Sequence, residues 1–169
     1  MYYYQYVEKL INVIRTEILK NMSTFEHLDF NNTNDDILFF DLNENVDYML
    51  YKFNNNTRAL MGESGNKVHI IIDNDANLTE LEYDFVAGKT SVFKMKTDKN
   101  IYSLFYFPET NTCSFFESIK DRNGDYLVHS KTNISFEDGF IDLSDTMECY
   151  KVVVDQAVNY INPTRAKKK

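Results

Sequence analysis

Residues 67–86, KVHIIIDNDANLTELEYDFV, show the clearest strand pattern in the chain. An apolar run, Val68–Ile72, leads through an Asp/Asn-rich segment into a second run in which Leu81, Tyr83 and Phe85 alternate with acidic residues. Such alternation is typical of a strand with one buried face and one wet face. Asp and Asn favour turns. The stretch therefore predicts two antiparallel strands joined by a hairpin loop.

The same pattern of apolar runs and turn residues extends from about Lys67 to Leu143. Asn123-Gly124 is the clearest hairpin signal within it. Short connections between the runs favour antiparallel neighbours over parallel crossovers. The predicted strands are Val68–Ile72, Thr79–Val86, Ser91–Lys96, Ile101–Phe107, Cys113–Ile119, Tyr126–Ser130, and Ile134–Phe136 pairing toward Phe140–Leu143.

Helical periodicity marks both ends of the chain. The first predicted helix runs from about Tyr3 to Met22, and the last from about Asp145 to Tyr160, with Pro163 ending it. The apolar stripe of the first helix consists of Tyr3, Val7, Leu10, Ile14 and Ile18, widened by Tyr6, Val13 and Met22. The stripe of the last helix consists of Met147, Tyr150, Val154, Ala157 and Ile161.

The segment between the first helix and residue 67 carries weaker signals. Ser23–Glu26 resembles a capping box that begins one short turn, and Ile37–Leu42 has the pattern of a short buried strand. Asn43 could cap a middle helix. Its apolar face would consist of Val46, Met49, Leu50 and Phe53. Residues 58–65 are ambiguous, and Ala59–Met61 fits another helical turn.

These elements predict an α+β fold: an antiparallel meander of about six or seven strands, flanked by an N-terminal and a C-terminal helix, with a short middle helix. The chain of 169 residues has the size of one domain. We expect a single domain over residues 1–163 and a basic C-terminal tail over 164–169.

The charge balance restricts the partners. Lys and Arg number 18 and Asp and Glu number 26, which gives a net charge of −8. An acidic chain is a poor nucleic-acid binder, because such binding needs a basic face that releases counterions. No apolar run is long enough to span a membrane, and the N-terminus lacks the pattern of a secretory signal. We therefore expect a cytoplasmic or virion protein without membrane contact.

One segment has the spacing of a calcium-binding loop. Asp73, Asp75, Asn77 and Asp84 fall at ligand positions of such a loop, but Leu78 stands where the loop needs glycine. The flanking segments have the pattern of strands rather than helices. A hairpin loop is therefore the favoured interpretation of this segment.

Nucleophiles and metal ligands show no catalytic spacing. The histidines are His27, His69 and His129, and the cysteines are Cys113 and Cys149. None of them stands in a zinc-ligand or nucleophile motif. His69 and His129 fall in predicted strands, where an ordinary hydrogen-bonded histidine is expected. The sequence predicts no enzyme activity, no catalytic residue, no metal and no cofactor.

Two clusters and the basic tail suggest contacts with other proteins. Tyrosines surround the first turn of the N-terminal helix, and tyrosine is enriched at protein interfaces. Strand alternation places three acidic residues on one wet face. The predicted contact residues are Tyr2, Tyr3, Tyr4, Tyr6, Glu80, Glu82, Asp84, Lys167, Lys168 and Lys169.

The sequence therefore favours a non-enzymatic structural or interaction protein. We expect a subunit of a homo- or hetero-oligomeric assembly of protein subunits, such as a phage virion neck, tail or connector component, with no direct sequence-specific nucleic-acid binding. A small acidic inhibitor or immunity-type protein that covers a basic site is the alternative. An enzyme or small-ligand binder with a pocket inside the sheet ranks third.

Overall fold

The structure is a computed structural model of the 169-residue chain. The residues that it describes are 3–28, 42, 46–65, 67–74, 77–84, 89–97, 100–110, 112–135, 154–155 and 157–162.

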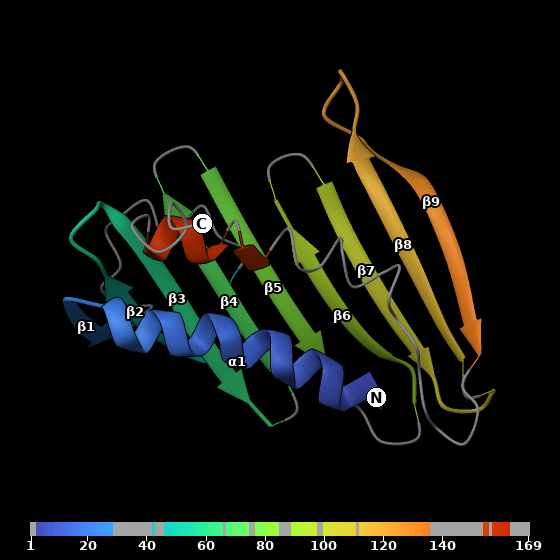
Figure 1. The fold of residues 1–169 in the computed structure, drawn as a ribbon, viewed down its shortest axis with the longest axis horizontal. Helices are drawn as coiled ribbons and strands as arrows, with labels where there is room; N and C mark the ends of the chain where they lie inside the picture. The colour runs from blue at the N-terminus through green and yellow to red at the C-terminus, as the bar shows by residue number, and fades with distance from the viewer. Residues whose placement is uncertain are drawn as a thin grey trace.

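A long helix, α1 (Tyr3–Asn21), precedes one nine-stranded antiparallel sheet (Figure 1). Every strand pairs with its sequence neighbours, so the spatial order is β1 to β9 without a crossover. The strands are β1 (Thr24–His27), β2 (Asp47–Lys52), β3 (Thr57–Ser64), β4 (Lys67–Asn74), β5 (Asn77–Asp84), β6 (Ser91–Lys96), β7 (Asn100–Phe107), β8 (Thr112–Lys120) and β9 (Tyr126–Ser135).

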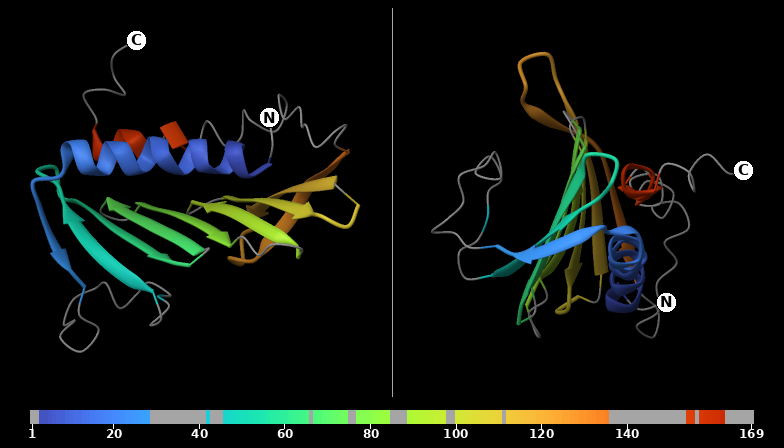
Figure 2. Two further views of the ribbon diagram at one scale, coloured as in Figure 1. Left: turned by 90° about the horizontal axis from the view of Figure 1, so that it is seen from below. Right: turned by 90° about the vertical axis from the view of Figure 1, so that its left-hand side faces the viewer.

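Helices lie on one side of this sheet. The helix α1 crosses one face, and the C-terminal helix, seen at residues 154–155 and 157–161, lies beside it on the same face (Figure 2). The predicted α+β class, the meander and both terminal helices are confirmed. The sheet has nine strands rather than six or seven.

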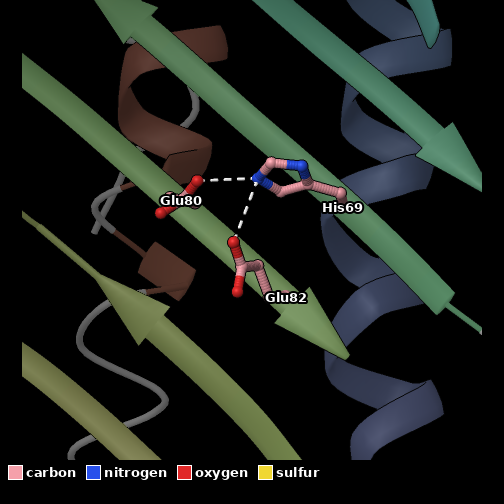
Figure 3. A group of neighbouring side chains, drawn as sticks. All are labelled: His69, Glu80 and Glu82. Carbon is pink, nitrogen blue, oxygen red and sulfur yellow. Dashed lines mark hydrogen bonds and ion pairs between the residues drawn. The ribbon is translucent and has the colours of Figure 1, made fainter. Parts of the chain in front are cut away.

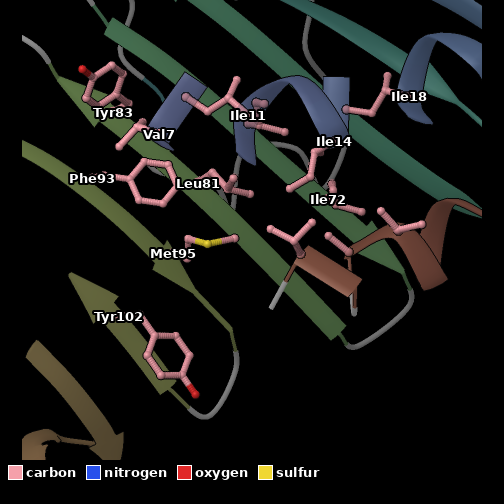
Figure 4. Close-up of a cluster of buried hydrophobic side chains, with 14 of the residues drawn as sticks. Val7, Ile11, Ile14, Ile18, Ile72, Leu81, Tyr83, Phe93, Met95 and Tyr102 are labelled. Atoms are coloured by element: carbon pink, nitrogen blue, oxygen red, sulfur yellow. The ribbon is translucent and has the colours of Figure 1, made fainter. Parts of the chain in front are cut away.

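The main core lies between α1 and the sheet. Val7, Ile11, Ile14 and Ile18 of α1 are 0–3% exposed and form one stripe. This stripe packs in a cluster with sheet residues that include Ile72, Leu81, Phe93 and Met95 (Figure 4). Each such side chain contributes about 1.5–3 kcal/mol when it is buried.

The predicted stripe of α1 is correct at Val7, Ile14 and Ile18. It omitted Ile11, which is buried, and it included Val13, which is 36% exposed.

The C-terminal helix is fastened to the turn between β2 and β3. The Tyr160 carbonyl accepts hydrogen bonds from Asn55 Nδ2 at 2.8 Å and from Thr57 Oγ1 at 2.9 Å. Asn74 Nδ2 in turn donates to Thr57 Oγ1 at 2.8 Å. The last carbonyls of a helix have no partner within the helix, and the side chains of Asn55 and Thr57 supply hydrogen bonds to one of them. In the predicted stripe of this helix, Val154, Ala157 and Ile161 are buried, whereas Met147 and Tyr150 lie outside the described residues.

The predicted middle helix is wrong, because the strand β2 (Asp47–Lys52) occupies most of its described part, with Val46 and Phe53 flanking it. Tyr48 and Leu50 face one side of the sheet, whereas Met49 and Tyr51 face the other. Since both faces of β2 are covered, its apolar residues follow one another without the clean alternation of a half-wet strand. The helical turn suggested for Ala59–Met61 is also wrong, and these residues belong to β3.

The predicted turn at Ser23–Glu26 is replaced by β1, a short edge strand. Thr24 pairs with Lys52 of β2, and the Ser23 amide donates to the Lys52 carbonyl at 2.8 Å. Pairing with β2 therefore overrides the local capping pattern. The strand predicted at Ile37–Leu42 lies outside the described residues except for Leu42.

The hairpin predicted at Asn123-Gly124 is confirmed between β8 and β9. Asp121 Oδ1 accepts hydrogen bonds from the amides of Asn123 and Asp125, both at 2.9 Å. Gly124 has a φ of 87°, in the left-handed region that glycine enters without strain.

The end of the meander differs from its prediction. Ile134 is not the start of a further hairpin but continues β9, where it pairs with Cys113. A register shift between Glu117 and Ser118 lets β9 carry an extra residue at that point. Phe136, the strand predicted at Phe140–Leu143 and the predicted start of the last helix at Asp145 lie outside the described residues.

None of the helices in the described part of the chain has both the length and the apolar character needed to cross a membrane.

Candidate functional site

The face of the sheet opposite α1 has its own small core near β2, β3 and β4. Tyr48, Leu50, Leu60 and Ile71 are buried there. Gly62 makes room for the ring of Tyr48, since a Cβ at this position would lie 2.7 Å from Tyr48 Cδ1. The absence of a side chain at Gly62 therefore leaves room for the Tyr48 ring against β3.

Sheet register then aligns four residues in one row on this face. Tyr48 is opposite Gly62, Gly62 is opposite His69, and His69 is opposite Glu82. Glu80 lies two residues before Glu82 on β5 and so projects from the same face. The Tyr48 hydroxyl reaches across Gly62 to the imidazole of His69.

The imidazole of His69 is held at both nitrogens. Its Nδ1 lies 2.6 Å from the Tyr48 hydroxyl. Its Nε2 lies 2.6 Å from Glu80 Oε2 and 3.5 Å from Glu82 Oε1 (Figure 3). Tyr48 is fully buried and His69 is 7% exposed, whereas the Glu82 side chain is 50% exposed. The site therefore has a buried inner end and an accessible outer end.

Either neutral tautomer of the His69 imidazole can form a hydrogen bond with the Tyr48 hydroxyl. With a neutral imidazole, Nε2–H donates to Glu80 and the Tyr48 hydroxyl donates to Nδ1. When Nε2 is engaged by a positive group instead, Nδ1 carries the proton and donates to the Tyr48 oxygen. A phenol can both donate and accept, so Tyr48 fits either form.

Neighbouring carboxylates on this face have a different environment. Asp73 Oδ2 lies 2.7 Å from the Arg58 guanidinium, and Asp84 Oδ2 lies 3.9 Å from Lys67 Nζ. On the next strand, Lys94 is opposite Glu82 in the sheet register, and Lys96 is opposite Glu80. The face therefore alternates acidic and basic groups, and two carboxylates converge on one histidine at its centre.

These three side chains could hold a metal ion. The ligand atoms of His69, Glu80 and Glu82 all lie within 4.8 Å of one another, and no other such cluster of three occurs in the described parts of the chain. A nitrogen and two carboxylate oxygens form a ligand set that zinc and related ions accept.

Strand alternation correctly placed Glu80, Glu82 and Asp84 on one face, while Leu81 and Tyr83 are buried on the other. Of the other predicted contact residues, Tyr3, Tyr4 and Tyr6 belong to α1, but their side chains lie outside the described set. Tyr2, Lys167, Lys168 and Lys169 lie outside the described residues.

The structure contradicts the calcium-loop pattern at Asp73–Asp84 and confirms the hairpin. Asn74 pairs with Asn77, so the two strands turn within two residues. Asp84 pairs with Lys67 at the far end of the hairpin from Asp73. That separation is roughly 20 Å at the usual rise per residue of a strand, which is far beyond the span of one calcium site.

The sequence did not single out Tyr48 or His69 as site residues. The signal that could have revealed His69 was the hairpin itself, because a turn at residues 75–76 places His69 opposite Glu82. Tyr48 could not be found in this way, because it fell in the predicted middle helix.

A cysteine–histidine pair between Cys113 and His69 is not formed. Cys113 faces the core under α1, whereas His69 faces the opposite side of the sheet. Burial raises the pKa of the Cys113 thiol to about 12, which suppresses its nucleophilic thiolate form. Cys149 lies outside the described residues.

Comparisons of this chain with known protein families, with curated proteins and with solved structures find no match.

Proposed function

We propose that this protein is a non-enzymatic subunit of a larger assembly, and that copies of it associate through the sheet face opposite α1. The observation that carries the proposal is a half-buried aromatic patch on that face. Phe105 stacks on Phe107 with ring centroids 6.4 Å apart, and it meets Phe116 edge to face at 5.4 Å. Aromatic residues are enriched in the cores of protein interfaces.

The surroundings of the aromatic patch suit an interface. A hollow beside Phe107 is lined by Lys89, Thr90 and Pro108 from the two neighbouring connections. Toward the centre of the sheet follow the charged residues of β5 and β6. An apolar centre beside a hollow and a polar rim is the common anatomy of a protein interface.

The charge pattern favours association with a second copy. Glu80 and Glu82 on β5 lie beside Lys96 and Lys94 on β6. In a two-fold symmetric contact the same patch occurs on both partners, so a patch with both signs of charge can complement itself. A small acidic inhibitor would need one uniformly acidic face, and the interspersed lysines favour the assembly proposal over that alternative.

Within this class we retain the proposal of a virion neck, tail or connector component, for which the composition and the tyrosine-rich N-terminus are the support. The N-terminal tyrosines would form a second contact, because a subunit of an extended assembly needs more than one interface.

The proposal is tested by light scattering over a concentration series with the wild-type chain and the Phe107→Glu variant. We expect the wild-type mass to rise above the 19.9 kDa of one chain as concentration increases. We expect Phe107→Glu to shift the equilibrium toward the monomer, because it places a charge in the aromatic patch.

Leu19→Glu is the matched control, because Leu19 is 48% exposed on α1, away from the patch. It should leave the association unchanged. A wild-type chain that stays monomeric at every concentration would contradict self-association and favour the inhibitor alternative.

A further inference from the structure

We propose that His69, Glu80 and Glu82 form a binding site for a divalent transition-metal ion, with Zn²⁺ as the best-fitting ion. The three side chains project from two neighbouring strands, β4 and β5, and their ligand atoms lie within 4.8 Å of one another. The proposal does not depend on self-association, because all three ligands belong to one chain.

Hydrogen bonding accounts for only part of this arrangement. The single Nε2–H of a neutral imidazole can donate fully to Glu80 at 2.6 Å, whereas Glu82 at 3.5 Å is too far for a good hydrogen bond. Two carboxylates are nevertheless gathered around one nitrogen. A divalent cation bound by all three groups would neutralise both carboxylates at once.

The contrast with neighbouring carboxylates supports this interpretation. On the same two strands, Asp73 contacts Arg58 at 2.7 Å and Asp84 lies 3.9 Å from Lys67. At each end of the β4–β5 hairpin, one carboxylate is therefore paired with one arginine or lysine. At the centre, the carboxylates of Glu80 and Glu82 converge on the same imidazole nitrogen, His69 Nε2, at 2.6 and 3.5 Å.

The distances suit a metal after small side-chain rotations. Zinc binds nitrogen and oxygen at about 2.0–2.2 Å, so two ligands on a tetrahedral ion lie about 3.4 Å apart. The observed separations from His69 Nε2 are 2.6 Å to Glu80 and 3.5 Å to Glu82, which bracket that value. Since β4 and β5 fix the backbone, only the glutamate torsions have to change.

The ligand types select the ion. Calcium and magnesium prefer sets of oxygen ligands, whereas an imidazole with carboxylates suits zinc and other first-row transition metals. The Glu82 side chain is 50% exposed, so the outer side of the site is open to water. Water molecules would complete the coordination there.

Tyr48 acts as the positioning residue for the ligand histidine. Histidines that bind metals through one nitrogen usually donate the other N–H to a fixed acceptor, which sets the tautomer and the ring orientation. The Tyr48 hydroxyl lies 2.6 Å from Nδ1 and is fully buried. It is therefore placed to accept that proton when Nε2 binds the ion.

Lys94 and Lys96 are opposite Glu82 and Glu80 in the sheet register. Each places a positive charge on the neighbouring strand, and such a charge opposes the binding of a cation nearby. Removing the charge of Lys94 should therefore strengthen metal binding, which an ordinary loss of surface charge far from the site would not do.

The test is calorimetric titration of the full-length chain with Zn²⁺. We expect Glu82→Gln to weaken binding at least about tenfold, because it replaces a charged ligand by a neutral amide. Asp84→Asn is the matched control: it removes a carboxylate from the same face of β5 outside the cluster, and it should leave affinity within about twofold. If Glu82→Gln alters the thermal unfolding of the chain, Glu80→Gln replaces it.

Two further variants separate a positioned site from nonspecific charge attraction. Tyr48→Phe should weaken Zn²⁺ binding about 10–100-fold, the usual effect of losing the partner of a metal-bound histidine. Lys94→Gln should strengthen it. The proposal would be overturned if Glu82→Gln and Asp84→Asn weakened Zn²⁺ binding to the same extent. That result would indicate nonspecific electrostatic attraction of the cation to an acidic surface.

Nitrogen NMR of the histidine side chains gives a second readout. On addition of Zn²⁺, the Nε2 resonance of His69 should shift, and those of His27 and His129 should not. Binding that shifts His27 or His129 instead, or no Zn²⁺ binding at millimolar concentration, would overturn the proposal.

Discussion

At the scale of single residues, the lack of a side chain at Gly62 determines where the Tyr48 ring can lie. It is opposite Tyr48 in the register, and the ring of Tyr48 occupies the space that a side chain at position 62 would need. The contact between the Tyr48 hydroxyl and His69 therefore depends on a missing methyl group on the strand between them.

We predict that Gly62→Ala destabilises the protein by about 1–3 kcal/mol, the usual cost of overpacking. The new Cβ would lie 2.6 Å from Val46 Cγ1 and 2.7 Å from Tyr48 Cδ1. The measurement is urea unfolding, with the exposed Ser64→Ala on the same strand as control. An unchanged unfolding midpoint would show that the Tyr48 ring moves aside without loss.

The buried thiol of Cys113 and the buried phenol of Tyr83 should make the free energy of unfolding fall at alkaline pH. Burial raises the pKa of Cys113 to about 12. Burial, with a smaller contribution from Glu8, raises the pKa of Tyr83 to about 12. In the unfolded chain a thiol titrates near about 8.5 and a phenol near about 10. Above these values the unfolded chain has lost protons that the folded chain retains, so the free energy of unfolding falls as pH rises.

We therefore predict that the contribution of Cys113 and Tyr83 to the free energy of unfolding is constant below about pH 8. Between pH 8 and about pH 12 this contribution should fall progressively. Urea unfolding at a series of pH values measures it. Cys113→Ala should be less stable at pH 7, because it leaves a cavity, but should show a shallower decline between pH 8 and 10. An equal slope in both proteins would contradict the assigned role of Cys113.

The face on which a strand residue lies can be predicted from sequence, whereas its cross-strand partner cannot. Alternation placed Glu80, Glu82 and Asp84 on one face because that property is local to one strand. The partners of these residues depend on register, and the Tyr48–His69 contact spans three strands. No local pattern contains that information.

At the scale of elements, the sequence located α1 and strands β4 to β8 within a few residues. Strands β5 and β6 show the alternation of a buried and a polar face, whereas β4 is buried on both faces and was found as a continuous apolar run between turn residues. Strand β2 also packs apolar side chains on both faces, but its apolar residues fit a helical spacing, so it was predicted as a helix. Strand β1 has four exposed residues and owes its existence to pairing with β2.

The attachment of the C-terminal helix gives a prediction for one hydroxyl. Thr57→Val should destabilise the protein by about 1–3 kcal/mol, because two hydrogen bonds are lost. The Thr57 hydroxyl no longer donates to the Tyr160 carbonyl, which keeps its bond from Asn55, and it no longer accepts from Asn74 Nδ2. The measurement is thermal or urea unfolding monitored by circular dichroism.

Thr79→Val is the matched control for this substitution. Thr79 is 0% exposed, as buried as Thr57 at 1%, but its hydroxyl has no hydrogen-bond partner in the described structure. The control should leave the free energy of unfolding unchanged or raise it, because it removes a buried hydroxyl that has no hydrogen bond to offset its desolvation. Equal destabilisation by both substitutions would show that shape, not hydrogen bonding, decides the effect at Thr57.

At the scale of the whole molecule, the sheet is open and β1 is one of its edges. All four residues of β1 are exposed, and Phe25 is 58% exposed. An unpaired edge can pair with another chain, and a charged side chain on the edge discourages this.

We predict that Phe25→Lys slows concentration-dependent aggregation on storage and changes the free energy of unfolding by no more than about 1 kcal/mol. Light scattering over time measures the first quantity and urea unfolding the second. Leu19→Lys is the control, since it removes an exposed apolar residue from α1 and not from the edge. An equal benefit from both substitutions would exclude edge pairing as the cause.

The neighbour-to-neighbour order of the strands has a consequence for synthesis on the ribosome. Each strand pairs with the one made just before it, so the sheet can grow hairpin by hairpin as the chain emerges. The helix α1 is made first, yet the β4–β6 side chains that cover its isoleucines come much later. The Tyr160 carbonyl reaches Thr57 across 103 residues, so that contact closes near the end of synthesis. Until β4 to β6 have emerged, the nascent chain exposes the apolar stripe of α1, so an early intermediate of this protein has a surface that favours chaperone binding or aggregation.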